Sequence, residues 1–360
     1  MKALIAMSGG VDSSVAAYMM KKNNFECEGV TMRLYENEDL GCSRFHTCCS
    51  SKDIEDASEV AFNLDMPYEV IDYTADFRKN IIDKFIKVYE NGGTPNPCLD
   101  CNRYMKFEKL LEEARKRGAE YIVTGHYARI KKNENTGRYL LKKALDDTKD
   151  QSYVLYMLTQ DQLKHICFPL GSMKKTEVRE IALEKGFVNA RKHDSQDICF
   201  VPDGDYSAFI SQYTGKKYPC GDFILSDGTK LGEHKGIISY TVGQRKGLGI
   251  AYKKPLYVKE INPVENKVVL GDNEELFRKT VILKDINLIS VPKIEVPMHC
   301  NAKIRYRQTE QPATVTQIDD NTLKVTFDMP QRAATVGQAG VLYDGDVVIG
   351  GGTIMEVRDE

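Results

Sequence analysis

The chain has 360 residues, more than one ordinary core needs and a suitable length for two or three domains. Its composition, 42% hydrophobic and 28% charged, is typical of a globular protein, and no apolar run approaches the roughly 20 residues that a membrane span requires. A net charge of −2 excludes a general polycation, so any RNA binding must depend on local basic surface.

The first 130 residues or so alternate between strand and helix patterns. Strands are predicted over residues 2–7, 28–34, 68–73 and 121–124, and helices over 11–22, 51–64, 77–89 and around 107–114. This alternation predicts an α/β fold, with a parallel sheet that carries helices on both faces. Ligands of such sheets lie at the carboxyl ends of the strands.

The pattern changes in the second half of the chain. Helical signal continues over 176–186 and 206–213, but from Gly221 onward short β-branched segments alternate with glycines. We therefore expect three domains: a nucleotide-binding domain over 1–212, a small β-rich domain over 213–277 and a second β-rich domain over 278–360.

A Gly-Ser loop, Ser8-Gly9-Gly10-Val11-Asp12-Ser13-Ser14, joins the first predicted strand to the first predicted helix. Glycines let the backbone approach an anion, and the hydroxyls and the free amides of a helix N-terminus donate to it. Asp12 cannot bind a bare phosphate, so we expect it to hold Mg²⁺ beside phosphates. The loop lacks the Gly-Lys-Ser/Thr of a Walker motif and resembles the SGGxDS loop of the ATP pyrophosphatase superfamily, whose members cleave ATP between the α and β phosphates.

Ten cysteines in a chain that opens with no signal peptide are expected to be cytoplasmic thiols, metal ligands or catalysts. Cys98 and Cys101 form a C-x-x-C pair in a predicted Pro-interrupted loop before a helix, and Cys199 lies in a distant loop. A thioredoxin-like redox pair and a zinc ribbon are the alternatives, but the sequence shows neither a thioredoxin pattern nor a second close pair. Cys42, Cys48 and Cys49 form the other cluster.

Two basic clusters are candidates for an RNA-binding surface, although such a cluster is more often a solvated face. The first comprises Arg129, Lys131, Lys132, Arg138, Lys142 and Lys143, and the second comprises Lys174, Lys175, Arg179, Lys185, Arg191 and Lys192.

Together these motifs resemble the bacterial tRNA-specific 2-thiouridylase family almost end to end. The matching segments are SGGVDSS (8–14), NPCLDCNRYMKF (96–107), TGHYAR (124–129), KDQSYVLY (149–156), DSQDICF (194–200), HKGIISYTVGQRKGLGI (234–250), RYR (305–307) and GQAGVLYDGDVVIGGG (337–352).

The resemblance implies a role for particular residues and a C-terminal β-barrel that binds tRNA. Cys101 is implied as the nucleophile and Cys199 as the sulfur-bearing cysteine. ATP is implied to contact Ala6, Met7, Ser8, Gly9, Gly10, Val11, Asp12, Ser13, Met32 and Gly125. The target base is implied to contact Asn96, Pro97 and Cys98, and the rest of the tRNA His126, Lys149, Asp150, Gln151, Arg305, Tyr306 and Gln338.

Cys98 departs from the family pattern, because many members carry Asp at this position. Three thiols, Cys98, Cys101 and Cys199, could hold a 4Fe–4S cluster that delivers an extra sulfide, and we favour this source of sulfur. The alternative is a persulfide on Cys199, followed by a Cys101–Cys199 disulfide. Free sulfide or a cysteine desulfurase relay would supply the sulfur.

The activity implied is ATP-dependent thiolation of the wobble uridine in lysine, glutamate and glutamine tRNAs. ATP would adenylate the C2 oxygen of the uridine, and sulfur would then replace it with release of AMP and pyrophosphate. Two other functions stay open: an adenylating enzyme that acts on a small metabolite, and a non-catalytic RNA-binding or iron–sulfur protein. No membrane partner is expected.

Overall fold

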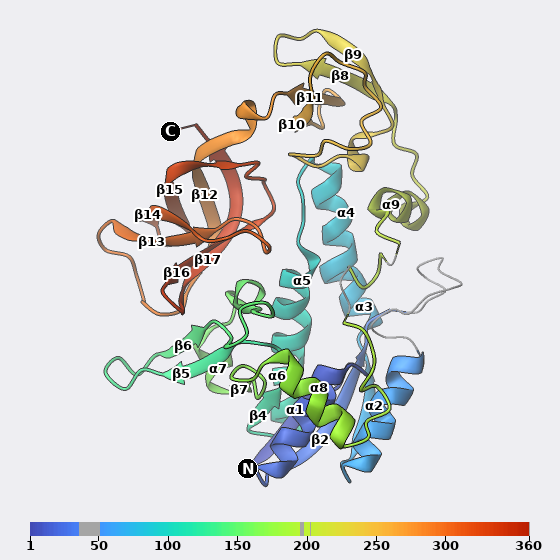
Figure 1. Ribbon diagram of the computed structural model, residues 1–360, viewed down its shortest axis with the longest axis vertical. Helices are drawn as coiled ribbons and strands as arrows, with labels where there is room; N and C mark the ends of the chain where they lie inside the picture. Colours follow the sequence, from blue (N-terminus) through green and yellow to red (C-terminus); the bar gives the residue numbers. More distant parts are fainter. Residues whose placement is uncertain (36–50, 195–197, 202, 360) are drawn as a thin grey trace. The chain divides into compact units, whose positions relative to one another are not determined.

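The structure, a computed structural model, describes residues 1–35, 51–194, 198–201 and 203–359 (Figure 1). These residues belong to two compact units, each discontinuous in sequence. The first comprises Met1–Ile81, Cys98–Gly204 and Asp346–Val348, and the second comprises Ile82–Pro97, Asp205–Gly345 and Ile349–Glu360. Cys42, Cys48 and Cys49 lie outside the described residues.

A parallel sheet with the strand order β3-β2-β1-β4-β7 forms the centre of the first unit. Its strands are β1 (Lys2–Ala6), β2 (Glu26–Arg33), β3 (Tyr68–Asp72), β4 (Tyr121–Val123) and β7 (Ile166–Cys167). Central strand β1 pairs in parallel with both neighbours, so that Ile5 lies opposite Gly29 of β2 and Val123 of β4. The predicted α/β class with a parallel sheet is confirmed.

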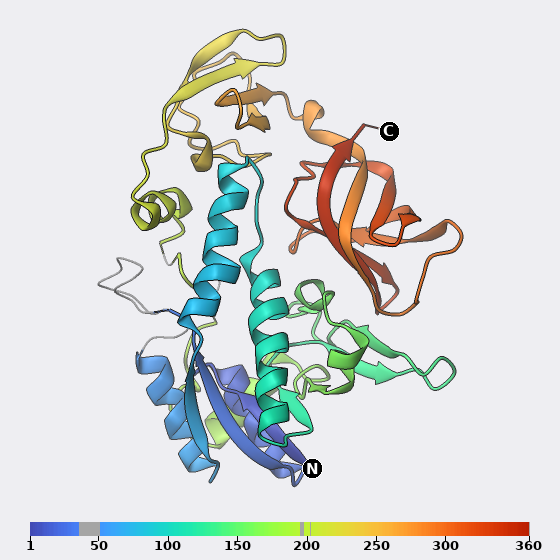
Figure 2. The ribbon, with the colours of Figure 1, turned by 180° about the vertical axis from the view of Figure 1, so that it is seen from behind.

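Helices connect these parallel strands, and crossovers of this kind are right-handed in nearly all proteins. The chain crosses the sheet in one direction from β1 to β3 and in the opposite direction from β3 to β4, which places α1 and α6 on opposite faces. Figure 2 shows α6 in front of the strands. The bounds are α1 (Val11–Lys22), α2 (Ser51–Asn63), α3 (Thr74–Phe77), η1 (Arg78–Ile82), α6 (Leu110–Lys116), η3 (Ser152–Leu155), α7 (Gln160–Lys164) and α8 (Lys175–Glu184).

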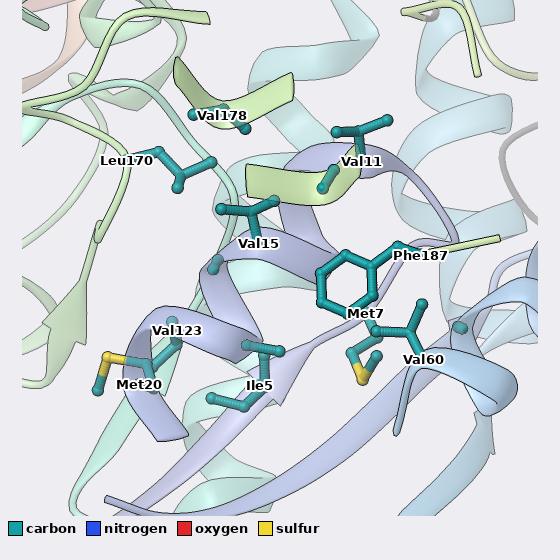
Figure 3. Close-up of a cluster of buried hydrophobic side chains, with 14 of the residues drawn as sticks. Ile5, Met7, Val11, Val15, Met20, Val60, Val123, Leu170, Val178 and Phe187 are labelled. Atoms are coloured by element: carbon teal, nitrogen blue, oxygen red, sulfur yellow. The ribbon is translucent and has the colours of Figure 1, made fainter. Parts of the chain in front are cut away.

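A hydrophobic core holds the residues on either side of the Gly-Ser loop (Figure 3). Ile5, Met7, Val11, Val15 and Val60 are all at most 4% exposed. Burial of each such side chain stabilises the fold by roughly 1.5–3 kcal/mol. Because Met7 precedes the loop and Val11 opens α1, the core fixes both ends of the loop.

The C-x-x-C pair lies in a helix, so the prediction of a loop there is wrong. Helix α5 (Pro97–Asp100) begins at Pro97 and continues directly into the π-helical η2 (Cys101–Lys109) and then α6. Proline suits the first helical turn because its missing amide has no partner there in any case. Cys98 therefore lies in the first turn of this helix and Cys101 opens its π-helical segment.

An antiparallel hairpin in the first unit was not predicted. Strands β5 (Arg129–Lys132) and β6 (Tyr139–Lys142) pair with Arg129 opposite Lys142, and β6 continues the ladder at Val347. The dense basic residues of this segment obscure the alternation that normally marks a strand.

Helices α4 (Asp83–Glu90) and α9 (Tyr206–Thr214) meet in the second unit. The rings of Tyr89 and Tyr206 stack with centroids 4.6 Å apart, and those of Phe85 and Phe209 meet edge-on at 6.5 Å. Helix α9 ends at Gly215, whose φ of 66° is the left-handed conformation common at helix ends. The predicted domain boundary at 212 falls inside this helix, and the three-domain division stays a prediction.

A small mixed sheet follows in the second unit, with the order β10-β11-β8-β9. The pair β8–β11 is parallel, whereas β8–β9 and β10–β11 are antiparallel. The bounds are β8 (Gly221–Leu225), β9 (Lys230–His234), η4 (Ile237–Ser239), β10 (Tyr257–Asn262) and β11 (Lys267–Gly271).

The C-terminal residues form a closed antiparallel barrel, as predicted. Strands follow the order β12-β15-β14-β13-β16-β17, and the pairing of β12 with β17 closes the cylinder around a core that includes Leu283, Val315 and Leu342. The bounds are η5 (Glu274–Leu276), β12 (Phe277–Leu288), β13 (Met298–Lys303), β14 (Gln311–Asp319), β15 (Thr322–Arg332), β16 (Ala339–Asp344) and β17 (Val347–Arg358). Among the described residues, no helix is both long and apolar enough to cross a membrane.

Candidate active site

The Gly-Ser loop lies between β1 and α1, as predicted, at the carboxyl end of the central strand. Gly10 is the N-cap of α1, and in the described structure no side chain caps the amides of the first turn. These amides therefore remain available to an anion. Gly9 has a φ of 69°, and a Cβ at this position would overlap the backbone of Asp53. Only glycine fits there.

The serine hydroxyls of the loop fold back on it. The Ser13 and Ser14 hydroxyls each donate to the Gly10 carbonyl at 3.0 Å, and the Ser8 hydroxyl donates to Ser13 Oγ at 3.3 Å. These bonds preorganise the turn. The Ser8 residue stays exposed and can reach a bound phosphate.

Two further expected ATP contacts border the loop. Gly125 follows β4, and a Cβ at this position would lie only 2.8 Å from the backbone of Asp12 and Ser13. The backbone of Gly125 therefore approaches α1 at a distance that a side chain would prevent. Met32 is buried in β2. The structure thus brings Gly125 to the loop, while the contacts of Met32 and Gly125 with adenosine stay predictions.

Asp12 takes part in an ion pair that the sequence did not indicate. Lys175 Nζ donates to both carboxylate oxygens of Asp12, at 2.7 and 2.8 Å, and the Tyr127 hydroxyl donates to Oδ1 at 2.8 Å. The Lys175 side chain is only 9% exposed, whereas that of Asp12 is 32% exposed. An ammonium therefore occupies the position beside Asp12 where magnesium was expected. The carboxylate and nearby hydroxyl oxygens are nonetheless the hard donors that Mg²⁺ prefers.

A second carboxylate, Asp194, shares the same ammonium. Lys175 Nζ lies 2.9 Å from Asp194 Oδ1, and Lys149 and Arg179 also pair with Asp194 at 2.7 and 2.8 Å. Burial alone would raise the pKa of Asp194, but the hydrogen bonds from Lys149 and Lys175 outweigh it and lower the pKa to about 2. Asp194 is thus charged at any physiological pH, and Lys175 bridges Asp12 of the Gly-Ser loop to Asp194, five residues before Cys199.

The back of the loop is held by Asn189 and Lys192. The Asn189 amide donates to the Gly9 carbonyl at 3.0 Å and to Ser14 Oγ at 2.9 Å. Lys192 donates to the same carbonyl at 3.1 Å and pairs with Asp53 and Asp56 of α2. Together these contacts tie the loop to α2.

The second basic cluster is therefore not one RNA-facing surface. Lys175, Arg179 and Lys192 turn inward to carboxylates around the loop, whereas the other members, Lys174, Lys185 and Arg191, are exposed. In the first cluster Arg129 and Lys142 both pair with Asp346 at 3.0 Å, and Lys131 and Lys132 are exposed on β5.

The three candidate thiols differ in exposure: Cys98 is exposed, Cys101 is buried and Cys199 is intermediate. The Tyr35 hydroxyl, just beyond β2, donates to the Cys199 carbonyl at 3.0 Å, so the Cys199 segment lies near the carboxyl edge of the sheet. Helix α3 touches both thiol segments, because Asp76 pairs with Lys109 of η2 at 3.1 Å and Phe77 meets Phe200 with ring centroids 5.8 Å apart.

Helix α3 thus contacts η2 and the residue after Cys199, while convergence of the thiols themselves stays a prediction. Among the described residues, no three His, Cys, Asp or Glu side chains are grouped so that they could hold a metal ion. The residues as arranged do not fit the expected 4Fe–4S cluster.

The residues expected to contact tRNA in the first unit have partners inside the protein. His126 is buried between Phe107 and Phe168, with its Nδ1 2.7 Å from the Thr124 hydroxyl, and this burial lowers its pKa well below the usual value. Asp150 accepts from the Ser152 hydroxyl at 2.7 Å, and Gln151 accepts from the Tyr127 amide at 2.9 Å.

In the second unit, Arg305 and Gln338 also bond to the backbone. Arg305 Nη2 donates to the carbonyls of Ala333 at 2.7 Å and Val242 at 3.3 Å. Gln338 Nε2 donates to the carbonyl of Thr94 at 2.8 Å, just before Asn96 and Pro97. Tyr306, in contrast, is 39% exposed. Contact of any of these residues with RNA stays a prediction.

Sequence reasoning missed the side chains that organise the loop: Tyr127, Lys175, Asn189, Lys192 and Asp194. Tyr127 and Asp194 do lie in the segments TGHYAR and DSQDICF, which were singled out for other residues. Lys175 and Lys192 were counted as surface charge, since a sequence does not show which carboxylate a lysine faces.

Comparison with known proteins gives matches over nearly the whole chain. Residues 1–203 match the family model described as tRNA methyl transferase HUP domain, 207–272 the tRNA methyl transferase PRC-barrel domain, and 278–354 the aminomethyltransferase beta-barrel domain. The tRNA-specific 2-thiouridylase MnmA of Clostridioides difficile (strain 630) is 49% identical over 353 residues, which are 98% of each chain. That of Lachnoclostridium phytofermentans is 48% identical over 356 residues, 99% of each chain.

Among solved structures, a 4-thiouridine synthetase–RNA complex with bound ATP aligns with 59% of this chain and 50% of that chain, at 19% identity and a TM-score of 0.33. Similarity at this level supports no conclusion.

Proposed function

Since the chain belongs to the family of tRNA-specific 2-thiouridylases, we propose that it uses ATP to replace the C2 oxygen of the tRNA wobble uridine with sulfur. The observation that carries the proposal is 49% identity along 98% of the chain to such an enzyme. The lysine, glutamate and glutamine tRNAs are the proposed substrates, and the cytoplasm is the proposed site of action.

The Gly-Ser loop is proposed to bind the phosphates of ATP. The uncapped amides of α1 and the exposed Ser8 would donate to them, and Asp12 would hold Mg²⁺ after Lys175 shifts toward the phosphates. Magnesium would offset the charge that develops as the C2 oxygen attacks the α-phosphate and pyrophosphate leaves. The uridine must leave the anticodon stack to react, which is common among base-modifying enzymes.

Sulfur is proposed to arrive as a persulfide on Cys199. The terminal sulfur of the persulfide attacks C2 and AMP leaves, so that the base is joined to Cys199 through a disulfide. Cys101 then attacks Cys199 Sγ, which releases the thiolated base and forms a Cys101–Cys199 disulfide that an external thiol must reduce. Among the described residues no group of three possible ligands could hold a metal ion, which favours this route over an iron–sulfur cluster, and no step is assigned to such a cluster.

The test is reconstitution with an unmodified glutamate tRNA transcript, Mg-ATP and a cysteine desulfurase with cysteine. We expect 2-thiouridine, measured by mass spectrometry of nucleosides, and AMP in equal amounts. Cys101→Ser and Cys199→Ser should abolish 2-thiouridine, whereas Cys220→Ser, which changes an exposed thiol in the second unit, should not.

Each alternative function predicts a different result. An enzyme that acts on a small metabolite would keep its full activity in both cysteine variants, and a non-catalytic RNA-binding protein would release no pyrophosphate. An anaerobic preparation that contains stoichiometric iron and sulfide, and loses activity when the iron is removed, would restore the cluster as the sulfur carrier.

A further inference from the structure

A hollow of about 710 Å³ in the small mixed-sheet region has no part in the chemistry described above. Arg245 and residues 247–256 line it, within the segment that connects η4 to β10. All of its residues belong to the second unit.

The segment is held in shape although it contains neither helix nor strand. Leu248 and Leu256 are buried, and the Ile250 side chain lies against Gly232 of β9, where a Cβ would approach it to 2.8 Å. Gly247 and Gly249 have φ values of 78° and 68°, which other residues rarely adopt. The hollow is therefore a built feature with an apolar floor.

The rim of the hollow carries an excess of positive charge. Residues 241–259 contain one arginine, four lysines and no aspartate or glutamate. Lys254 pairs with Asp272 and Lys259 pairs with Glu275 at 2.7 Å. Arg245, Lys246 and Lys253 are exposed, and none of the three has a carboxylate partner in the described part of the chain.

An exposed aromatic ring lies among these cations. Tyr252 is 37% exposed, and Lys253 Nζ lies 5.8 Å from the centroid of its ring. Cations that neutralise phosphates, next to an aromatic ring on which a base can stack, are the usual combination at surfaces that bind RNA loops and single strands. An acidic protein surface would use the cations but would not need the exposed ring.

We propose that this hollow binds the sugar–phosphate backbone of the tRNA substrate, with Arg245, Lys246 and Lys253 on phosphates and Tyr252 stacked on a base. The inference rests on the proposed function, because it identifies the RNA as the tRNA that is thiolated. It adds a binding surface in the small mixed-sheet region to the contacts expected elsewhere in the chain.

The test compares the triple variant Arg245→Gln/Lys246→Gln/Lys253→Gln with the parent chain. Binding of a fluorescently labelled, unmodified glutamate tRNA transcript is followed by anisotropy across a range of salt concentrations. We expect the slope of log Kd against log salt to fall by about 1 for each phosphate that the variant no longer neutralises, and Kd at low salt to rise at least about tenfold.

The matched control changes two lysines of the same sheet that already have carboxylate partners. Lys230 pairs with Asp222 at 2.6 Å and Lys267 pairs with Glu265 at 2.7 Å, so Lys230→Gln/Lys267→Gln should leave the salt slope near that of the parent. Tyr252→Ala should weaken binding at every salt concentration, whereas Tyr252→Phe should not.

Each remaining outcome has a separate meaning. Identical slopes for the triple variant and the parent chain would overturn the hollow as a tRNA site. The proposal would also be rejected if the triple variant binds tRNA with unchanged affinity but receives sulfur from the desulfurase protein more slowly. That result would show that the hollow binds an acidic protein. A parent chain that neither binds nor thiolates tRNA would refute the proposed function itself.

Discussion

Lys175 shows how one buried side chain can organise two parts of a site. Its ammonium lies between the carboxylates of Asp12 and Asp194, and the Tyr127 hydroxyl completes the group. A buried ammonium is costly unless carboxylates surround it, and removal of one partner leaves the others unpaired. Lys175 therefore couples the Gly-Ser loop to Asp194, which precedes Cys199 by five residues.

We expect Lys175→Gln to lower the free energy of unfolding by about 3 kcal/mol, because two carboxylates lose their shared cation. Lys175→Arg should retain much of the stability. Urea denaturation followed by circular dichroism measures the change in stability. ATP affinity, measured by calorimetry, should likewise fall more in Lys175→Gln than in Lys175→Arg. Equal stability of the Gln variant and the parent would show that the bridge is not a stabilising contact.

The buried thiols should resist alkylation in the folded chain. Burial raises the pKa of Cys300 to about 12 and that of Cys167 to about 11, so at pH 8 only roughly one Cys300 in 10,000 is a thiolate. We expect iodoacetamide to label the exposed Cys98 and Cys220 first, as measured by peptide mass spectrometry. In urea all four should react, and rapid labelling of Cys300 without urea would contradict its burial.

His126 should make the fold sensitive to acid. Burial between two phenylalanines lowers its pKa in the folded chain, so the unfolded chain binds the proton more readily. The stability that depends on a neutral His126 is therefore fully present well above pH 6.5, which is about the pKa of histidine in an unfolded chain. This stability is lost as the pH falls through that value. His126→Phe should reduce the loss of stability between pH 7 and pH 5, measured by thermal unfolding, and an unchanged loss would contradict this assignment.

At the scale of elements, a turn of the barrel holds the segment that leads into α5. The Thr94 amide donates to the Val336 carbonyl at 3.0 Å, and Gln338 Nε2 returns to the Thr94 carbonyl at 2.8 Å. Gly337 has a φ of 91°, and a Cβ there would lie 3.1 Å from the same carbonyl. This turn therefore determines where Asn96 and Pro97, the expected contacts of the target base, are placed.

We expect Gln338→Ala to lower kcat about tenfold or more while tRNA affinity changes little, because the target base loses its alignment and not its binding surface. A direct contact with tRNA would instead raise Kd at an unchanged kcat. Single-turnover thiolation at saturating tRNA, together with anisotropy, separates the two results. Gln311→Ala, which changes a half-buried glutamine of the same barrel, serves as the control.

One early stretch of the chain, Ile82–Pro97, belongs to the second compact unit, not to the first. Helix α4 comes early in sequence, but Phe85, Ile86 and Tyr89 are buried in the second unit, against α9 among other elements. The residues matched by the HUP-domain model, 1–203, thus include a helix that depends on later parts of the chain.

A fragment that ends at residue 204 should therefore expose the apolar face of α4. We expect it to aggregate or bind a hydrophobic dye, measured by size-exclusion chromatography and fluorescence, whereas the whole chain does neither. The same fragment with Phe85→Gln, Ile86→Gln and Tyr89→Gln should bind less dye. A monomeric, dye-free fragment of native sequence would contradict this account.

The sequence by itself determined the local features of this protein. Hydrophobic periodicity located most strands and helices of the parallel sheet, and the residues Ser8–Ser14 were correctly placed between the first strand and the first helix. Family motifs identified the class of reaction, because the segments that carry chemistry are short and contiguous. Even so, the prediction placed Cys98 and Cys101 in a loop, because proline breaks a helix when it lies in the interior. Pro97 instead occupies the first turn of α5, where proline is well tolerated.

Only the tertiary structure decided which charges face one another. Lys175 and Asp12 are 163 residues apart, and Gln338 and Thr94 are 244 apart, so no local pattern pairs them. The second basic cluster was one group in sequence but divides in space into side chains that pair with Asp12, Asp194 or the α2 carboxylates and side chains that are exposed. The physical reason is that a side chain's role depends on the partner that the fold brings to it, and long-range partners are set by packing.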